Sequence, residues 1–123
     1  MFKILVVEDI EDSMEIVERT LKDQFEILKA YDGEQAVEIS LKEKPDIILM
    51  DISLPNMNGL EATQKIKKYP YMKDVPIIAI SASAMAKDIE DALGAGCIDF
   101  IAKPIRPREL KKRIEEIARR YYG

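Results

Sequence analysis

The sequence of 123 residues has no histidine, no tryptophan and a single cysteine. Without histidine the chain cannot build a Ser-His-Asp or Cys-His nucleophile system, a histidine metal site or a histidine phosphodonor. Cys97 cannot form an internal disulfide or a thiolate zinc site, and we expect it to be a small buried hydrophobic side chain. Any metal site in this chain must therefore use oxygen ligands.

Long apolar runs are also absent. The N-terminal run Phe2–Val7 is too short for a signal peptide, and no stretch approaches the ~18 apolar residues of a membrane span. We therefore expect a cytoplasmic protein without a membrane partner. The length and the 47% hydrophobic content predict one domain over residues 1–123. The initiating Met1 favours a stand-alone protein over an excised domain.

The net charge of −4 is unevenly placed, because residues 1–61 carry −9 and residues 103–123 carry +5. The acidic half argues against a nucleic-acid partner. In the basic segment, opposite charges at i,i+4 spacing favour a solvated helix face, and a protein-binding role for that face stays open. These pairs are Glu109–Arg113, Glu115–Arg119 and Glu116–Arg120.

Five short apolar runs alternate with segments of helical periodicity. Several of the runs are apolar without alternation, which is typical of parallel strands covered on both faces. The predicted strands are Phe2–Val7, Phe25–Ala30, Asp46–Met50, Val75–Ile80 and Ile98–Ala102. The predicted inward faces of the helices are Met14, Val17 and Leu21; Ala36, Ile39 and Ser40; Leu60, Thr63 and Ile66; Ile89, Ala92 and Leu93, ending at Gly94-Ala95-Gly96; and Leu110, Ile114, Ile117, Ala118 and Tyr121, beginning at Pro107.

This β–α alternation, repeated five times, predicts an α/β fold with one open parallel sheet and helices on both faces. In such sheets the site lies beyond the carboxyl ends of the strands. Those ends carry Glu8-Asp9, Asp51, Ser81 and Lys103. Converging carboxylates require a cation, and oxygen ligands favour Mg²⁺. Asp51 could then act as a nucleophile that forms an aspartyl phosphate, with Lys103 and Ser81 binding phosphoryl oxygens.

Four segments resemble the receiver domain of two-component response regulators, and the resemblance covers essentially the whole chain. It implies a flavodoxin-like, doubly wound sheet of order 2-1-3-4-5 with five helices. The segments are Val6-Val7-Glu8-Asp9, Ile48-Leu49-Met50-Asp51-Ile52-Ser53-Leu54-Pro55-Asn56-Met57-Asn58-Gly59, Ile80-Ser81-Ala82 and Lys103-Pro104.

The resemblance also implies a role for each site residue. Asp51 is the phosphoacceptor, and Lys103 binds the phosphoryl group. Asp9, Asp51 and the backbone carbonyl of Ser53 coordinate Mg²⁺, whereas Glu8 acts largely through water.

Two further residues take switch roles by the same resemblance, Ser81 as the hydroxyl and Phe100 as the aromatic. The family more often has Asp at the position of Glu8 and Thr at that of Ser81, but both residues keep the required chemistry. A cis Lys103-Pro104 bond is also implied.

The resemblance implies a phosphorylation-activated switch. Its partners would be a sensor histidine kinase or histidine phosphotransfer protein and a downstream protein, with the chain a monomer or weak homodimer. We expect no enzyme activity beyond self-phosphorylation and autodephosphorylation.

The alternatives are a phosphate sink or shuttle in a phosphorelay, a flavodoxin-like nucleotide carrier, an Mg²⁺-dependent aspartyl-phosphatase, and an interaction module without phosphorylation. A nucleotide carrier would need a phosphate loop where this chain has Glu8–Asp12. A phosphatase of the haloacid dehalogenase type would need a second Asp at the position of Ser53. A degenerate interaction module would lack some of the acids or the lysine.

Overall fold

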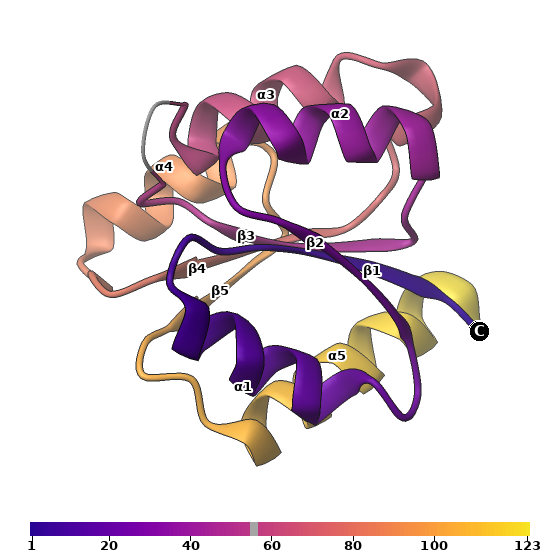
Figure 1. Cartoon of the computed structure of the whole chain (residues 1–123). Coiled ribbons are helices and arrows are strands. Elements are labelled where there is room, and N and C mark those ends of the chain that lie inside the picture. Colours follow the sequence, from indigo (N-terminus) through magenta and orange to yellow (C-terminus); the bar gives the residue numbers. More distant parts are fainter. Residues whose placement is uncertain (55–56) are drawn as a thin grey trace.

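The computed structural model describes residues 1–54 and 57–123, and in these residues five strands alternate with five α-helices (Figure 1). The strands are β1 (Lys3–Val7), β2 (Glu26–Ala30), β3 (Ile47–Asp51), β4 (Ile77–Ser81) and β5 (Asp99–Ala102). The helices are α1 (Glu11–Leu21), α2 (Gly33–Glu43), α3 (Gly59–Lys67), α4 (Ala86–Ala95) and α5 (Pro107–Tyr122), with a 3-10 helix η1 (Pro70–Met72) before β4.

All strand pairs are parallel, and the sheet has the order β2-β1-β3-β4-β5. This confirms the fold and strand order that the resemblance implied. The chain moves outward from β1 to β2 and then returns past β1 to β3. As a result the carboxyl ends of β1 and β3 are neighbours, with Val7 in register with Met50.

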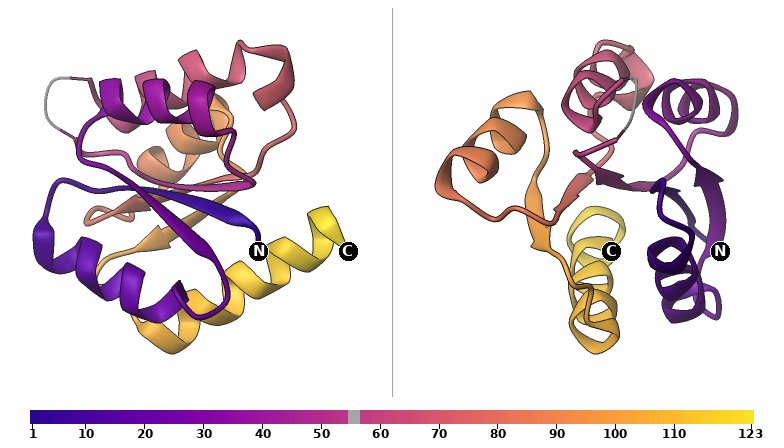
Figure 2. Two further views of the ribbon diagram at one scale, coloured as in Figure 1. Left: turned by 45° about the vertical axis from the view of Figure 1, so that its right-hand side comes forward. Right: turned by 60° about the vertical axis from the view of Figure 1, so that its left-hand side comes forward.

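The helices cover both faces of the sheet, with α1 and α5 on one side and α2, α3 and α4 on the other (Figures 1 and 2). Alternate strand residues enter the two core layers. Ile4 and Val6 pack towards α1 and α5, whereas Leu5 and Val7 pack in the opposite layer. Because both strand faces are buried, an unbroken apolar sequence is what this sheet requires.

The predicted strands and helices agree with the structure to within a few residues, but some predicted inward side chains do not. Leu93 is 49% exposed and Tyr121 is 38% exposed. In α4 the predicted Ala92 is buried, and Ala95 is buried in place of the predicted Leu93. The helix ends within the predicted segment Gly94-Ala95-Gly96. Gly94 still lies inside α4, and the C-cap is Gly96, whose φ of 119° suits glycine.

Of the three predicted i,i+4 pairs in α5, Glu109–Arg113 forms, with 3.9 Å between Nη2 and Oε1. Glu115 instead accepts a hydrogen bond from Gln24. Among the described residues, every helix is too short or too polar to span a lipid bilayer.

Candidate functional site

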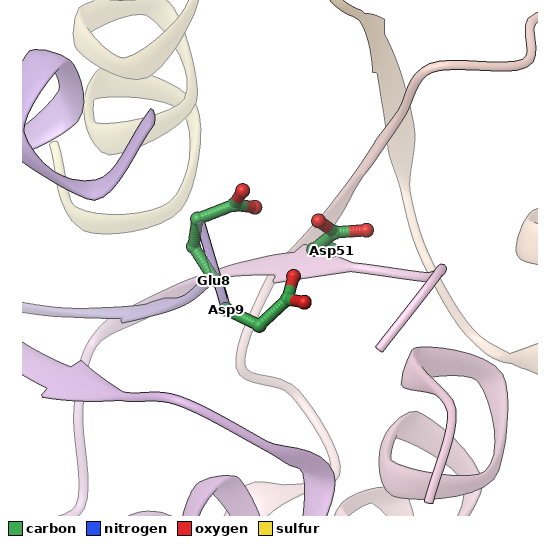
Figure 3. Close-up of side chains that lie close together, drawn as sticks. All are labelled: Glu8, Asp9 and Asp51. Atoms are coloured by element: carbon green, nitrogen blue, oxygen red, sulfur yellow. The ribbon is translucent and has the colours of Figure 1, made fainter. Parts of the chain in front are cut away.

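Three carboxylates meet where β1 and β3 end. Glu8 and Asp9 follow β1 directly, and Asp51 is the last residue of β3. One carboxylate oxygen from each residue lies within 4.8 Å of the others. Figure 3 shows the Asp9 carboxyl group pointing to the end of β3 beside Asp51, with Glu8 next to them. The sheet order thus brings together the acids that the sequence predicted.

Lys103 reaches the same cluster from the loop after β5. Its Nζ lies 2.7 Å from Glu8 Oε1 and 3.0 Å from Asp51 Oδ2. The lysine side chain is 15% exposed, and the two carboxylates are almost fully buried. The ammonium therefore neutralises part of the negative charge inside the site.

Burial and the shared charges separate the pKa values of these groups. Burial and, after it, the contact with Asp51 together raise the pKa of Glu8 to about 7, although Lys103 opposes the rise. Burial also favours the protonated form of Asp51, but hydrogen bonds from Glu8, the Ser53 N–H and Lys103 hold its pKa below the usual range. Asp51 is therefore the carboxylate that stays ionised.

The pKa of Lys103 moves in the direction that keeps it charged. Burial lowers it, but the hydrogen bonds to Glu8 and Asp51 outweigh burial, so the net pKa is raised. Asp51 is thus an ionised carboxylate beside a charged lysine, which is the state in which it can react as a nucleophile.

The cluster has the donor set of a hard divalent cation. Glu8, Asp9 and Asp51 all offer carboxylate oxygens, which Mg²⁺ prefers. Oε2 of Glu8 is buried and has no hydrogen-bond partner among the described residues. Asp9 is exposed, so an ion can reach the cluster from solvent. The residues that are present thus fit a magnesium ion.

The backbone after β3 holds Asp51 in place. The N–H of Ser53 donates to Asp51 Oδ1 at 2.8 Å. A Cβ at Gly59 would overlap the carbonyl oxygen of Asp51 and lie 2.6 Å from Cα of Ile52, so the start of α3 can approach this strand end only because residue 59 is glycine. Pro55 and Asn56, which belong to the same motif, lie outside the described residues.

The family resemblance implied a role for the Ser53 carbonyl, and sequence reasoning missed the Ser53 N–H. The signal was present, because an Asp side chain commonly accepts a hydrogen bond from the residue two positions later. The carbonyl of Ser53 as a metal ligand stays a prediction.

The two predicted switch residues lie on the neighbouring strands. Ser81 ends β4 and is 2% exposed, and its Oγ accepts a hydrogen bond from the N–H of Ser83 at 3.1 Å. Phe100 lies in β5, is half-buried and packs against the core layer of α2, α3 and α4. The Lys103-Pro104 bond is cis, as the resemblance implied. Cys97 is buried, and burial raises the pKa of its thiol to about 11.

Solved structures with this architecture include chemotaxis protein CheY4 of Vibrio cholerae. It is 26% identical, with a TM-score of 0.91 over 95% of this chain and 98% of that one. The receiver domain of sensor histidine kinase PA1611 from Pseudomonas aeruginosa is 36% identical, with a TM-score of 0.85 over 98% and 96% of the two chains. That structure has a magnesium ion coordinated in its active-site cleft.

A third similar structure is the CheX–CheY complex of Borrelia burgdorferi with BeF₃ and magnesium. The chain matched there is 28% identical, with a TM-score of 0.88 over 94% of this chain and 88% of that one. The family model of the response regulator receiver domain matches residues 4–115. With this match over most of its length, and with the strand order and acidic cluster described above, the chain belongs to the response regulator receiver domain family of two-component signalling.

Proposed function

We propose that the chain is a phosphorylation-activated switch in which Asp51 accepts a phosphoryl group from a histidine kinase or a histidine phosphotransfer protein. The observation that carries this proposal is the state of Asp51. The Asp51 residue is 2% exposed, its carboxylate stays ionised because its pKa is lowered, and Oδ2 lies 3.0 Å from the ammonium of Lys103.

The absence of histidine bears on the source of the phosphoryl group. These 123 residues cannot form a phosphohistidine, so the phosphoryl group comes from a donor outside this domain. An oxygen of Asp51 attacks phosphorus, the bond from phosphorus to the donor nitrogen breaks, and its electron pair returns to the imidazole. Lys103 neutralises the charge that collects on the phosphoryl oxygens, and the N–H of Ser53 orients the acceptor.

The metal ligands of this proposal come from the acid cluster and from the family resemblance. Asp9, Asp51 and the Ser53 carbonyl would hold Mg²⁺ directly, and Glu8 would act largely through water. Bound Mg²⁺ supplies positive charge that offsets the carboxylates and the phosphoryl oxygens. The magnesium ions in the PA1611 receiver domain and in the CheX–CheY complex support this assignment.

The proposal includes the output and the place of action. The phosphorylated domain presents a changed surface to a downstream protein in the cytoplasm. It has no substrate turnover beyond its own phosphorylation and dephosphorylation, because the position two residues after Asp51 is Ser53, which offers no general acid.

Labelling with phosphoramidate and Mg²⁺, followed by intact mass measurement, tests the proposal. The chain should gain one phosphoryl group that is stable in acid and labile in base. Asp51→Asn should gain none, whereas Asp91→Asn, a change in a surface ion pair on α4, should label like the wild type. Full labelling of Asp51→Asn would overturn the assignment.

A further inference from the structure

Phe100 lies on the last strand of the sheet, so one edge of its strand pairs with β4 and the other edge is free. Both backbone groups of Phe100 bond to side chains. Its N–H donates to Asp99 Oδ1 at 2.8 Å, and its carbonyl oxygen accepts from Arg113 Nη1 at 2.9 Å. Unpaired strand edges are usually protected in this way by charged side chains.

Arg113 closes these contacts into a bridge. The same Nη1 lies 3.3 Å from Asp99 Oδ2, and Nη2 lies 3.9 Å from Glu109 Oε1 one turn earlier in α5. Both backbone groups of Phe100 are therefore linked to the Arg113 guanidinium. The carbonyl oxygen is bonded to it directly, and the N–H is linked to it through the carboxylate of Asp99. A planar guanidinium can serve several acceptors at once, which a lysine ammonium on this scaffold does less well.

The bridge joins the two helical layers at Phe100. The phenyl ring packs in the layer of α2, α3 and α4, whereas the guanidinium that holds the backbone comes from α5 in the opposite layer. Beside the bridge is a cavity of about 280 Å³, lined by Lys103, Pro104 and Arg106 on the loop and by Leu110 and Arg113 on α5. α5 packs on this part of the sheet through Leu110 and Ile114, and Arg113 adds polar contacts beside the cavity, where apolar packing is interrupted.

We propose that Arg113 is a positioning residue that holds the backbone of Phe100 against α5, and that it thereby sets how strongly the Phe100 region responds to occupancy of the Asp51 site. The second half of this inference rests on the proposed function. Arg113 and Asp99 have side chains that are 35% and 37% exposed, so solvent screens the ion pair and its effect on global stability is small. The effect is on the local position of Phe100.

The test compares amide hydrogen exchange at Phe100 in the wild type, Arg113→Gln, Arg113→Lys and Arg119→Gln. Arg119 is an exposed cation on the same helix and serves as the matched control. Loss of the bridge should speed exchange of the Phe100 N–H by about 5- to 20-fold in Arg113→Gln. Arg113→Lys should restore part of the protection, and Arg119→Gln should leave it unchanged. Asp99→Asn keeps an acceptor for the N–H but weakens the link to Arg113. Its Phe100 exchange rate should therefore lie between those of the wild type and Arg113→Gln.

A titration with beryllofluoride and Mg²⁺ then measures the response. In the wild type the amide shifts of both Ser53 and Phe100 should move. In Arg113→Gln the Ser53 shift should be kept, while the Phe100 shift becomes smaller because the free protein already samples the displaced position.

The bridge would be overturned if the Phe100 N–H exchanged at the same rate in Arg113→Gln as in the wild type. It would also be overturned if Arg119→Gln sped this exchange as much as Arg113→Gln. Both outcomes are independent of the beryllofluoride titration. A full Phe100 shift in Arg113→Gln would overturn its control of the response. If the wild-type Ser53 shift does not move, the proposed function and the coupling both fail, while the exchange data still decide whether Arg113 holds Phe100.

Discussion

The ammonium of Lys103 lies 3.0 Å from a carboxylate oxygen of Asp51, although 52 positions separate the two residues in the sequence. Parallel strands and right-handed crossovers bring the ends of β3 and β5 to the same edge of the sheet, so a distant loop can supply the cation of this pair. Lys103 also contacts Glu8, which places one positive charge between two buried carboxylates.

Lys103→Ala should slow phosphorylation more than it disturbs the fold. Loss of a preorganised charge at the reacting group should reduce the rate of labelling by phosphoramidate by ~10²-fold, while Mg²⁺ keeps the carboxylates compensated. Labelling rate and circular dichroism of the same sample measure the two effects. Lys111→Ala, an exposed lysine on α5, is the control. Unfolding of Lys103→Ala in Mg²⁺ would show that the residue is structural instead.

Magnesium should stabilise the folded chain through Asp9. A ligand that binds only the native state at about tenfold its dissociation constant adds ~1.4 kcal/mol to the free energy of unfolding. We expect millimolar Mg²⁺ to raise the melting temperature of the wild type. Asp9 is exposed, so Asp9→Ala should fold normally and lose this rise. A wild-type melting temperature that does not change with Mg²⁺ would contradict the metal site.

Two glycines should respond in opposite ways to alanine. Gly59→Ala places a Cβ against the backbone of Asp51 and should destabilise the fold by about 1–3 kcal/mol. Gly94→Ala fills open space on an exposed helix position and should stabilise it by about 0.5–1 kcal/mol. Urea denaturation measures both. A neutral Gly59→Ala would mean that α3 can move away from Asp51 at little cost.

A phosphoryl mimic bound at Asp51 should change the positions of Ser81 and Phe100. The hydroxyl of Ser81 should move towards a phosphoryl mimic, and the space it leaves behind β4 can be filled by Phe100. Amide shifts on adding beryllofluoride and Mg²⁺ should therefore extend from Asp51 through Ser81 to Phe100 and on to residues 84–87 and 106–112. Changes confined to Asp51 and its direct neighbours would favour a phosphate sink instead of a switch.

The apolar pattern was sufficient for the strands because both faces of this sheet are buried, and the polar residues at the strand ends indicated the site before any geometry. The order of the strands in the sheet could not be predicted from this pattern. Nothing in the periodicity of β1 or β3 states that they are neighbours, and only the family resemblance supplied that order.

Other features depend on contacts that periodicity does not encode. Leu93 has helical spacing with Ala92 and Ile89 but faces solvent, because the short α4 buries alanines against the sheet and leaves the larger side chain outside. Asp99 begins an ordinary strand in the sequence, and its link to Arg113 exists only once α5 has folded back along β5. The raised pKa of Glu8 likewise depends on burial that the sequence does not state.

Without divalent metal, the stability of the chain should fall as the pH rises through the range of the Glu8 pKa. The folded-state pKa of Glu8 is about 7, compared with 4.5 for an ordinary glutamate, so the folded state holds this proton more tightly than the unfolded state does. Its contribution is complete below pH 4.5 and is lost as the pH passes 7. Asp51 and Asp9 face Glu8 with negative charge, and Lys103 compensates only part of it.

Urea denaturation in EDTA at pH 5 and at pH 7.5 measures this loss, which should be on the order of 2 kcal/mol. Glu8→Gln removes the titrating proton and should make the two values nearly equal, whereas Glu116→Gln on the exposed face of α5 should keep the wild-type difference. Because the cost arises from carboxylates that repel one another when deprotonated, saturating Mg²⁺ should restore most of the stability at pH 7.5. A pH dependence that is unchanged in Glu8→Gln would assign the titration to another group, and it would remove the argument that Glu8 and Asp51 share one electrostatic site.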